Sequence, residues 1–173
     1  GKAFAAEKGV QVRVDGGPEA RWVEMAQADG DLVFEASEYQ LTDFMRRRPG
    51  LLDASKRQSL HDRPAAILVR PGNPRRIQRL DDLAKPGVKL RDVNGAGQQG
   101  LWEDLAGRRG LIPALQRNIA MSFANTAEAM GAWRDRPELD AWITFESWHH
   151  RMGGQTEVVR LPALKLHVST AIG

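Results

Sequence analysis

Residues 92–104 carry the clearest signal in the chain, and they read Asp-Val-Asn-Gly-Ala-Gly-Gln-Gln-Gly-Leu-Trp-Glu-Asp. A strand-like run over residues 88–93 leads into a glycine-rich loop (residues 94–100), and a helix is expected to begin near Leu101. Small loop residues leave the first N–H groups of that helix open, and a helix start carries partial positive charge. The stretch predicts a small-anion site, with an ordinary glycine-containing turn as the alternative. The residues expected to face the anion are Gly97, Gln98, Gln99 and Gly100.

The combination of a strand end and polar residues recurs elsewhere in the chain. Residues 31–34 and 119–123 read as short strands that precede helices, and the apolar strand over residues 139–145 ends in polar residues. In open α/β sheets, ligands bind outside the carboxyl ends of strands, so these ends are expected to meet at one cleft. The simpler interpretation is that Ser and Thr only cap their helices. The candidate contacts at these strand ends are Ser37, Asn125, Thr126 and Thr144.

Composition narrows the function classes. The chain has 173 residues, 42% of them hydrophobic, and no cysteine, which excludes a disulfide framework, a thiol nucleophile and a zinc–thiolate site. The formal net charge of +3 suits an anionic ligand. Basic residues alternate with acidic ones and lack an aromatic stacking platform, which disfavours nucleic acid. No apolar run approaches the roughly 20 residues of a membrane span, so no membrane insertion is expected.

Strands alternate with helical segments along the chain, which predicts an α/β fold with a parallel or mixed sheet. Residues 1–9 read as the end of a helix stopped by Gly9, and residues 10–14 alternate as a half-buried strand does. The chain therefore looks incomplete at both ends, with a first strand missing before Gly1 and a questionable join at residues 162–164.

Five motifs in order resemble the accessory colonization factor branch of type II periplasmic solute-binding proteins, which is related to molybdate and sulfate binders. The resemblance covers most of the chain, from about Val10 to Leu161. The motif residues are Gly17–Trp22, Asp31–Ser37, Gly72–Pro74 with Leu80–Leu83, Asn94–Arg108, and Asn118–Ile119 and Asn125 with Asp140–Thr144.

This resemblance implies two α/β lobes with mixed sheets and a hinge, closing on a small oxyanion, carboxylate or phosphorylated metabolite. It implies lobe 1 over residues 1–69, lobe 2 over residues 70–145 and a return to lobe 1 over residues 146–173. It also implies a periplasmic location and delivery of the solute to an ABC permease. The alternative is a ligand-sensing or adhesion module without a transporter.

Other functions have weaker signals. Glu146, His149 and His150 share a helical face but lack a third His or Cys nearby, so no metal and no cofactor is expected. No nucleophile, base and orienting residue can be named together, so no enzyme activity is expected. Trp142 is expected to pack in the core. The hypothesis is that neutral donors, and not a buried salt bridge, meet the anion's charge.

Overall fold

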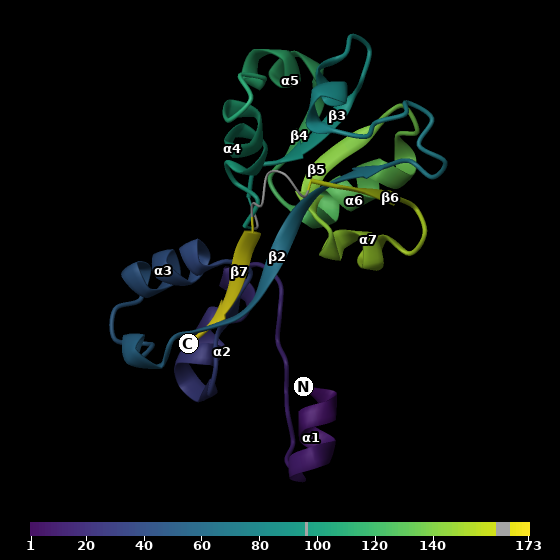
Figure 1. Ribbon diagram of the computed structural model, residues 1–173. Helices are drawn as coiled ribbons and strands as arrows, with labels where there is room; N and C mark the ends of the chain where they lie inside the picture. The colour runs from purple at the N-terminus through teal and green to yellow at the C-terminus, as the bar shows by residue number, and fades with distance from the viewer. Residues whose placement is uncertain (96, 162–166) are drawn as a thin grey trace.

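The structure, a computed structural model, describes residues 1–95, 97–161 and 167–173, and one long strand organises it. Strand β2 (Gln58–Val69) passes through both lobes of the molecule (Figure 1). Its first part pairs antiparallel with β7 (His167–Ile172), and its second part pairs antiparallel with β5 (Ala141–Phe145) and β6 (Glu157–Arg160). The strand order is β1-β7-β2-β5-β3-β4, with β6 on β2, and this mixed sheet confirms the predicted α/β class.

Lobe 2 contains the second part of β2 and the larger hydrophobic core. β3 (Leu90–Val93) pairs in parallel with both β4 (Ile119–Phe123) and β5. Apolar residues of β2 and β5 are buried against apolar residues of the helices and form this core. The helices of lobe 2 are η3 (Leu80–Ala84), α4 (Leu101–Gly107), α5 (Ile112–Asn118), α6 (Thr126–Asp135) and α7 (Ser147–Met152).

Lobe 1 contains the first part of β2, with β7 and β1 (Phe34–Glu35) beside it. The predicted strand over residues 31–34 is shorter than expected, because only two residues pair with β7. A small core of Val23, Val33, Leu41 and Phe44 joins the helices to this sheet. The helices of lobe 1 are η1 (Glu19–Arg21), α2 (Val23–Asp29), α3 (Glu38–Arg47) and η2 (Ala54–Lys56).

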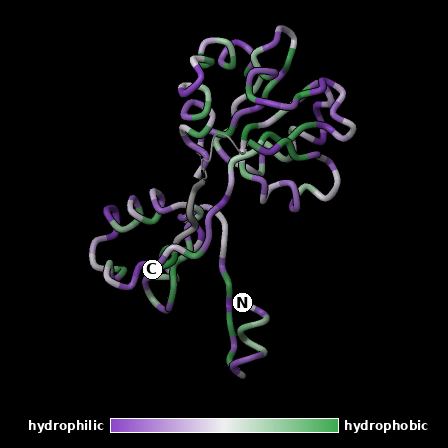
Figure 2. The backbone as a smooth tube through the Cα atoms, viewed as in Figure 1, coloured by the Kyte–Doolittle hydropathy of each residue, from purple (hydrophilic) through white to green (hydrophobic). Residues whose placement is uncertain are grey.

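The N-terminal segment lies apart from both lobes (Figure 1). Helix α1 (Lys2–Lys8) ends as predicted at Gly9, which has a left-handed φ of 64°. The expected strand over residues 10–14 is wrong: the described chain gives it no pairing partner, and Val14 is 78% exposed. In Figure 2 the hydrophobic positions of this extended stretch alternate with hydrophilic ones. Alternation alone does not make a strand, because the backbone N–H and C=O groups need a neighbour.

The strand pairing bears on the domain boundaries, which stay a prediction. Residues 146–160 form α7 and β6 and remain with lobe 2, because β6 pairs with β2 from Ala66 to Val69. Within the described residues, the chain reaches lobe 1 again at β7. The questionable join at residues 162–164 lies outside the described residues. No helix in the described ranges has the length and apolar character needed to span a bilayer.

Candidate functional site

Three of the predicted site residues form one buried network in lobe 2. The Thr144 hydroxyl donates to Gln98 Oε1 at 2.6 Å, and Gln98 Nε2 donates to Thr126 Oγ1 at 3.1 Å. All three side chains are buried, and Thr144 is fully so. The end of β5, the glycine-rich loop and the start of α6 therefore meet, as the strand-end argument predicted.

The direction of these hydrogen bonds separates two roles. The single hydroxyl hydrogen of Thr144 is used by Gln98, so Thr144 has no donor left for an anion. Thr126 accepts from Gln98, which leaves its own hydroxyl hydrogen to donate. Gln98 and Thr144 thus position Thr126, and Thr126 is the member suited to contact an anion.

Ser37 lies at the start of α3 in lobe 1, as Thr126 lies at the start of α6 in lobe 2. Its side chain is buried, and its Oγ accepts from the backbone N–H of Gln40 at 3.1 Å, capping α3. The capping interpretation is therefore confirmed for Ser37. Like Thr126, the capping hydroxyl keeps its hydrogen, so the cap does not exclude a contact with an anion.

Gly97 brings the two lobes into contact. Its φ of 76° favours glycine, and a Cβ added to it would lie 3.0 Å from Gln40 Oε1, 3.3 Å from Arg63 Nη2 and 3.5 Å from the Ala36 Cβ. The glycine-rich loop of lobe 2 therefore lies directly against the start of α3 in lobe 1. We call this contact between Gly97, Ala36, Gln40 and Arg63 the interlobe junction.

Arg63 is the residue at the junction that sequence reasoning missed. Its side chain is only 7% exposed, and one Nη donates to the Ala36 carbonyl. Its guanidinium stacks on the Phe145 ring, 4.1 Å from the centroid. Its Nε is buried without a hydrogen-bond partner in the described structure, and so is Gln40 Oε1. A signal was available, since Arg63 is a charged residue separated only by Pro64 from the apolar run over residues 65–69.

The electrostatics of the junction differ from the hypothesis of neutral donors alone. Burial lowers the pKa of Arg63, and no carboxylate of the described chain contributes to that shift. A buried cation without a counterion is unfavourable, because its lost hydration is not replaced. The structure thus places a positive charge where an anion would compensate it, against Ala36 and Gly97, which are the sequence neighbours of Ser37 and Gln98.

The remaining candidates lie differently. Gln99 is exposed, and Gly100 has a φ of 75° with open space on its Cβ side. Asn125 caps α6, with its Oδ1 accepting from the backbone N–H of Glu128 at 3.0 Å. Helix α4 has seven residues, too short to concentrate much charge at its start. In the described residues, the Asn125 side chain is engaged by its cap and nothing lies within 4 Å of a Cβ added to Gly100.

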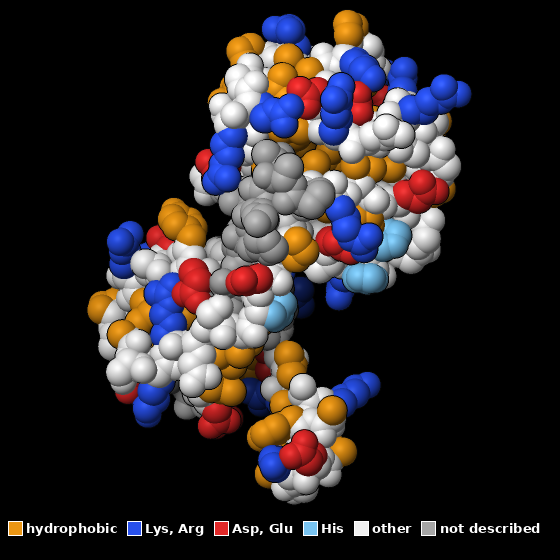
Figure 3. Space-filling view, viewed as in Figure 1, with side chains coloured by type: hydrophobic (Ala, Val, Ile, Leu, Met, Phe, Trp, Pro, Cys, Tyr) orange, Lys and Arg blue, Asp and Glu red, His pale blue; other side chains and the backbone are white. Residues whose placement is uncertain are grey.

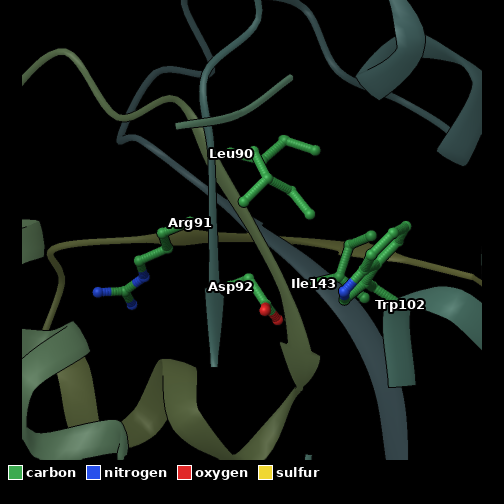
Figure 4. Close-up of a pocket in the computed structure, with 6 residues that line it drawn as sticks. Leu90, Arg91, Asp92, Trp102 and Ile143 are labelled. Carbon is green, nitrogen blue, oxygen red and sulfur yellow. The ribbon is translucent and has the colours of Figure 1, made fainter. Parts of the chain in front are cut away.

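Trp142 packs in the core as predicted. It is fully buried, and the Arg91 guanidinium lies 3.8 Å from the centroid of its ring. A small cavity of about 10 Å³, enough for one water, lies on the other side of β3. Figure 4 shows Asp92 and Trp102 toward this cavity and the Arg91 side chain pointing away from it. Arg91 contributes to the lining of the cavity, while its guanidinium packs on the other side against Trp133, Trp142 and the Ala129 carbonyl of α6.

The histidines noted in the sequence make an ordinary side-chain contact. His149 Nδ1 lies 2.9 Å from Thr156 Oγ1, and no group of three or more metal-binding side chains occurs within residues 1–95, 97–161 and 167–173. On the face shown in Figure 3, Lys and Arg side chains lie among Asp and Glu. That distribution resembles an ordinary solvated surface more than an extended nucleic-acid-binding face.

Comparison with known families agrees with this two-lobed geometry. The family model for bacterial extracellular solute-binding proteins matches residues 1–171. The chain belongs to this family. As a solute-binding protein, it has its two lobes joined by β2, which fits the type II fold predicted from the sequence. No curated protein matches the chain significantly.

Solved structures of other solute-binding proteins share the fold. PEB3 bound to L-phospholactate is 28% identical, with a TM-score of 0.87 over 99% of this chain and 78% of that chain. Peb3 from Campylobacter jejuni is 29% identical, with a TM-score of 0.85 over 99% and 77% of the two chains. The sulfate-binding protein SubI from Mycobacterium tuberculosis H37Rv, at 21% identity and a TM-score of 0.70 over 99% and 68%, shows likeness of fold alone.

Proposed function

We propose that this solute-binding protein holds a small oxyanion, carboxylate or phosphorylated metabolite at the interlobe junction. The observation that carries the proposal is Arg63, a buried guanidinium whose Nε lacks a partner in the described residues. An anion that bonds to this Nε restores the interactions that the side chain loses on leaving water. The phospholactate bound by PEB3 supports the same ligand class.

The proposed contacts come from both lobes. Arg63 and Ser37 lie on the lobe 1 side of the junction, and Thr126 lies on the lobe 2 side at the start of α6. Both hydroxyls keep a hydrogen to donate, and both stand at the starts of ten-residue helices, whose dipoles favour negative charge. One anion contacting all three groups would hold the lobes together.

Access to the site requires the lobes to separate. A carbon added to Gly97 would lie 3.0 Å from Gln40 Oε1 and 3.3 Å from Arg63 Nη2, tighter than ordinary contact, so the lobes touch at the junction in this structure. Hinge motion about the segments that cross between lobes is the usual way in which such proteins admit a ligand. The proposed cycle is opening, capture of the anion and closure, after which an ABC permease takes the solute from the closed form in the periplasm.

Finer placement within the family is also part of the proposal. The five ordered motifs favour the accessory colonization factor branch, and the likeness to PEB3 is higher than the likeness to the sulfate binder. This supports an organic anion over a bare inorganic one.

Titration calorimetry with sulfate, phosphate, citrate and phosphoglycerate tests the proposal. We expect saturable binding of at least one of these anions, and a more compact particle by small-angle scattering when that anion is added to an opened, ligand-free sample. Failure of all four anions to bind would refute an anion-binding function. Binding without compaction would refute the closure step.

A further inference from the structure

Two side chains at the interlobe junction each carry an unpartnered polar atom, and the two atoms are of opposite kind. Arg63 Nε is a donor, Gln40 Oε1 is an acceptor, and both are buried without a hydrogen-bond partner in the part of the chain that the structure describes. Gln40 Oε1 and Arg63 Nη2, which belongs to the same guanidinium as Nε and donates to the Ala36 carbonyl, lie 3.0 and 3.3 Å from the same point, the position of a Cβ on Gly97. The two side chains therefore converge on one small volume.

An acceptor in that place sets a condition on the ligand. An oxyanion presents only lone pairs to Arg63, and these are complementary to the guanidinium. The same lone pairs turned toward Gln40 Oε1 would leave two acceptors facing each other, both buried, which is unfavourable. In the orientation that the structure shows, with its oxygen buried at the junction, Gln40 is satisfied by a ligand that carries a hydroxyl or an acidic O–H beside its anionic oxygen.

We infer that the site selects anions that carry an O–H donor next to the charged group, such as phosphate or a 2-hydroxy carboxylate, over anions without one. This inference rests on the proposed function and refines its ligand class. Gln40 is the specificity-determining residue, because its oxygen is the unpartnered acceptor at the junction. Arg63 supplies attraction to both kinds of anion and cannot distinguish them.

Two matched ligand pairs test the inference on the unmodified protein by calorimetry. Inorganic phosphate keeps at least one P–OH group at neutral pH and sulfate has none, while lactate has a hydroxyl that propionate lacks. We expect phosphate to bind at least about tenfold more tightly than sulfate, or lactate than propionate, since a buried acceptor left without a partner lowers the affinity by about this factor. Preference in the phosphate pair alone identifies an acidic O–H as the donor, and preference in the lactate pair alone identifies an alcohol.

Gln40→Met removes the acceptor at similar size and keeps a good helix former in α3. It should reduce the preferred pair's affinity ratio to within about twofold of one. Gln116→Met, at an exposed position of α5, should leave the ratio unchanged. Equal affinities within both pairs in the unmodified protein, or a ratio that survives Gln40→Met, would overturn the inference while anion binding stands. If none of these ligands binds and none of the four anions named above binds, the proposed function is overturned as well.

Discussion

Replacing Arg63 with methionine should weaken ligand binding without weakening the ligand-free fold. Methionine keeps much of the unbranched stem and removes the charge. The guanidinium has one bond to the Ala36 carbonyl, a stacking contact at 4.1 Å from the Phe145 ring centroid and an unpartnered Nε. The guanidinium is therefore expected to strengthen ligand binding without stabilising the ligand-free fold.

The binding effect follows from the unpartnered Nε. A hydrogen bond between charged groups contributes about 1.5–3 kcal/mol, which corresponds to roughly a 10–150-fold rise in Kd when it is lost. The side chain is 7% exposed, so solvent does little to screen this interaction.

The stability effect combines a loss and a gain. The carbonyl bond and the stacking contact contribute about 1 kcal/mol each. When buried charged groups are replaced by apolar side chains of similar volume, the net change, with such losses included, is often neutral or stabilising by about 1–4 kcal/mol. We therefore expect the free energy of unfolding without ligand to stay equal or to rise, with a thermal midpoint that does not fall.

Calorimetry with the best-binding anion and thermal unfolding without ligand measure the two effects separately. Arg117→Met removes the same charge from an exposed position in α5 and should change neither. If Arg63→Met binds the anion as tightly as the unmodified protein does, Arg63 is not a ligand contact. If its midpoint falls by several degrees, Arg63 is a structural residue and the reasoning from the unpartnered Nε is wrong.

Five further substitutions test other parts of the structure, one of them as a control. Gly97→Ala places a carbon at the closed junction and should weaken anion binding at least tenfold in calorimetry. Gly100→Ala has a similar φ but open space around the added carbon, so it should lower only the stability of the fold, by the backbone strain of about 1 kcal/mol. In Gln98→Glu the carboxylate accepts from both threonine hydroxyls, which turns the Thr126 hydroxyl away from the ligand, and it adds negative charge. Calorimetry should therefore show a rise in Kd of tenfold or more. Unchanged affinity would contradict the assigned hydrogen-bond directions. Arg70→Met loses three bonds to carbonyl groups, at 2.6–2.9 Å, and should lower stability by about 2 kcal/mol in denaturant unfolding. Arg91→Met should not lower it, because burial already lowers the pKa of Arg91 to about 9 and two of its nitrogens lack partners; a loss as large as that of Arg70→Met would contradict this.

Local signals predicted the helices and their starts well. Helix α3 begins after Ser37 and ends at Arg47 as expected, because a capping serine and an apolar stripe are both written within a few residues. The start of α4 at Leu101 and the end of α1 at Gly9 follow equally local chemistry. Where a helix start or end depends only on neighbouring residues, the sequence was sufficient to predict it.

Contacts between distant segments explain what the sequence did not reveal. The first part of β2 was not predicted, because its charged residues and Pro64 do not resemble a strand until β7 pairs with them. The position of Arg63 depends on Phe145 and Ala36, which lie far from it in the sequence. Gln98 was predicted at the site, but its bracing role depends on hydrogen bonds to residues 28 and 46 positions away.

The site lies where β2 changes partners, and this place suits a protein that must sense closure. Pro64 is the last residue that pairs with β7, and Ala65 is the first that pairs with β5. Proline has no N–H to donate, so the strand is held less firmly there than on either side. Arg63 precedes this position and contacts lobe 1 at Ala36 and lobe 2 at Phe145. An anion bound to Arg63 would therefore act at the pivot between the lobes, where a small change in side-chain position produces a large movement of each lobe.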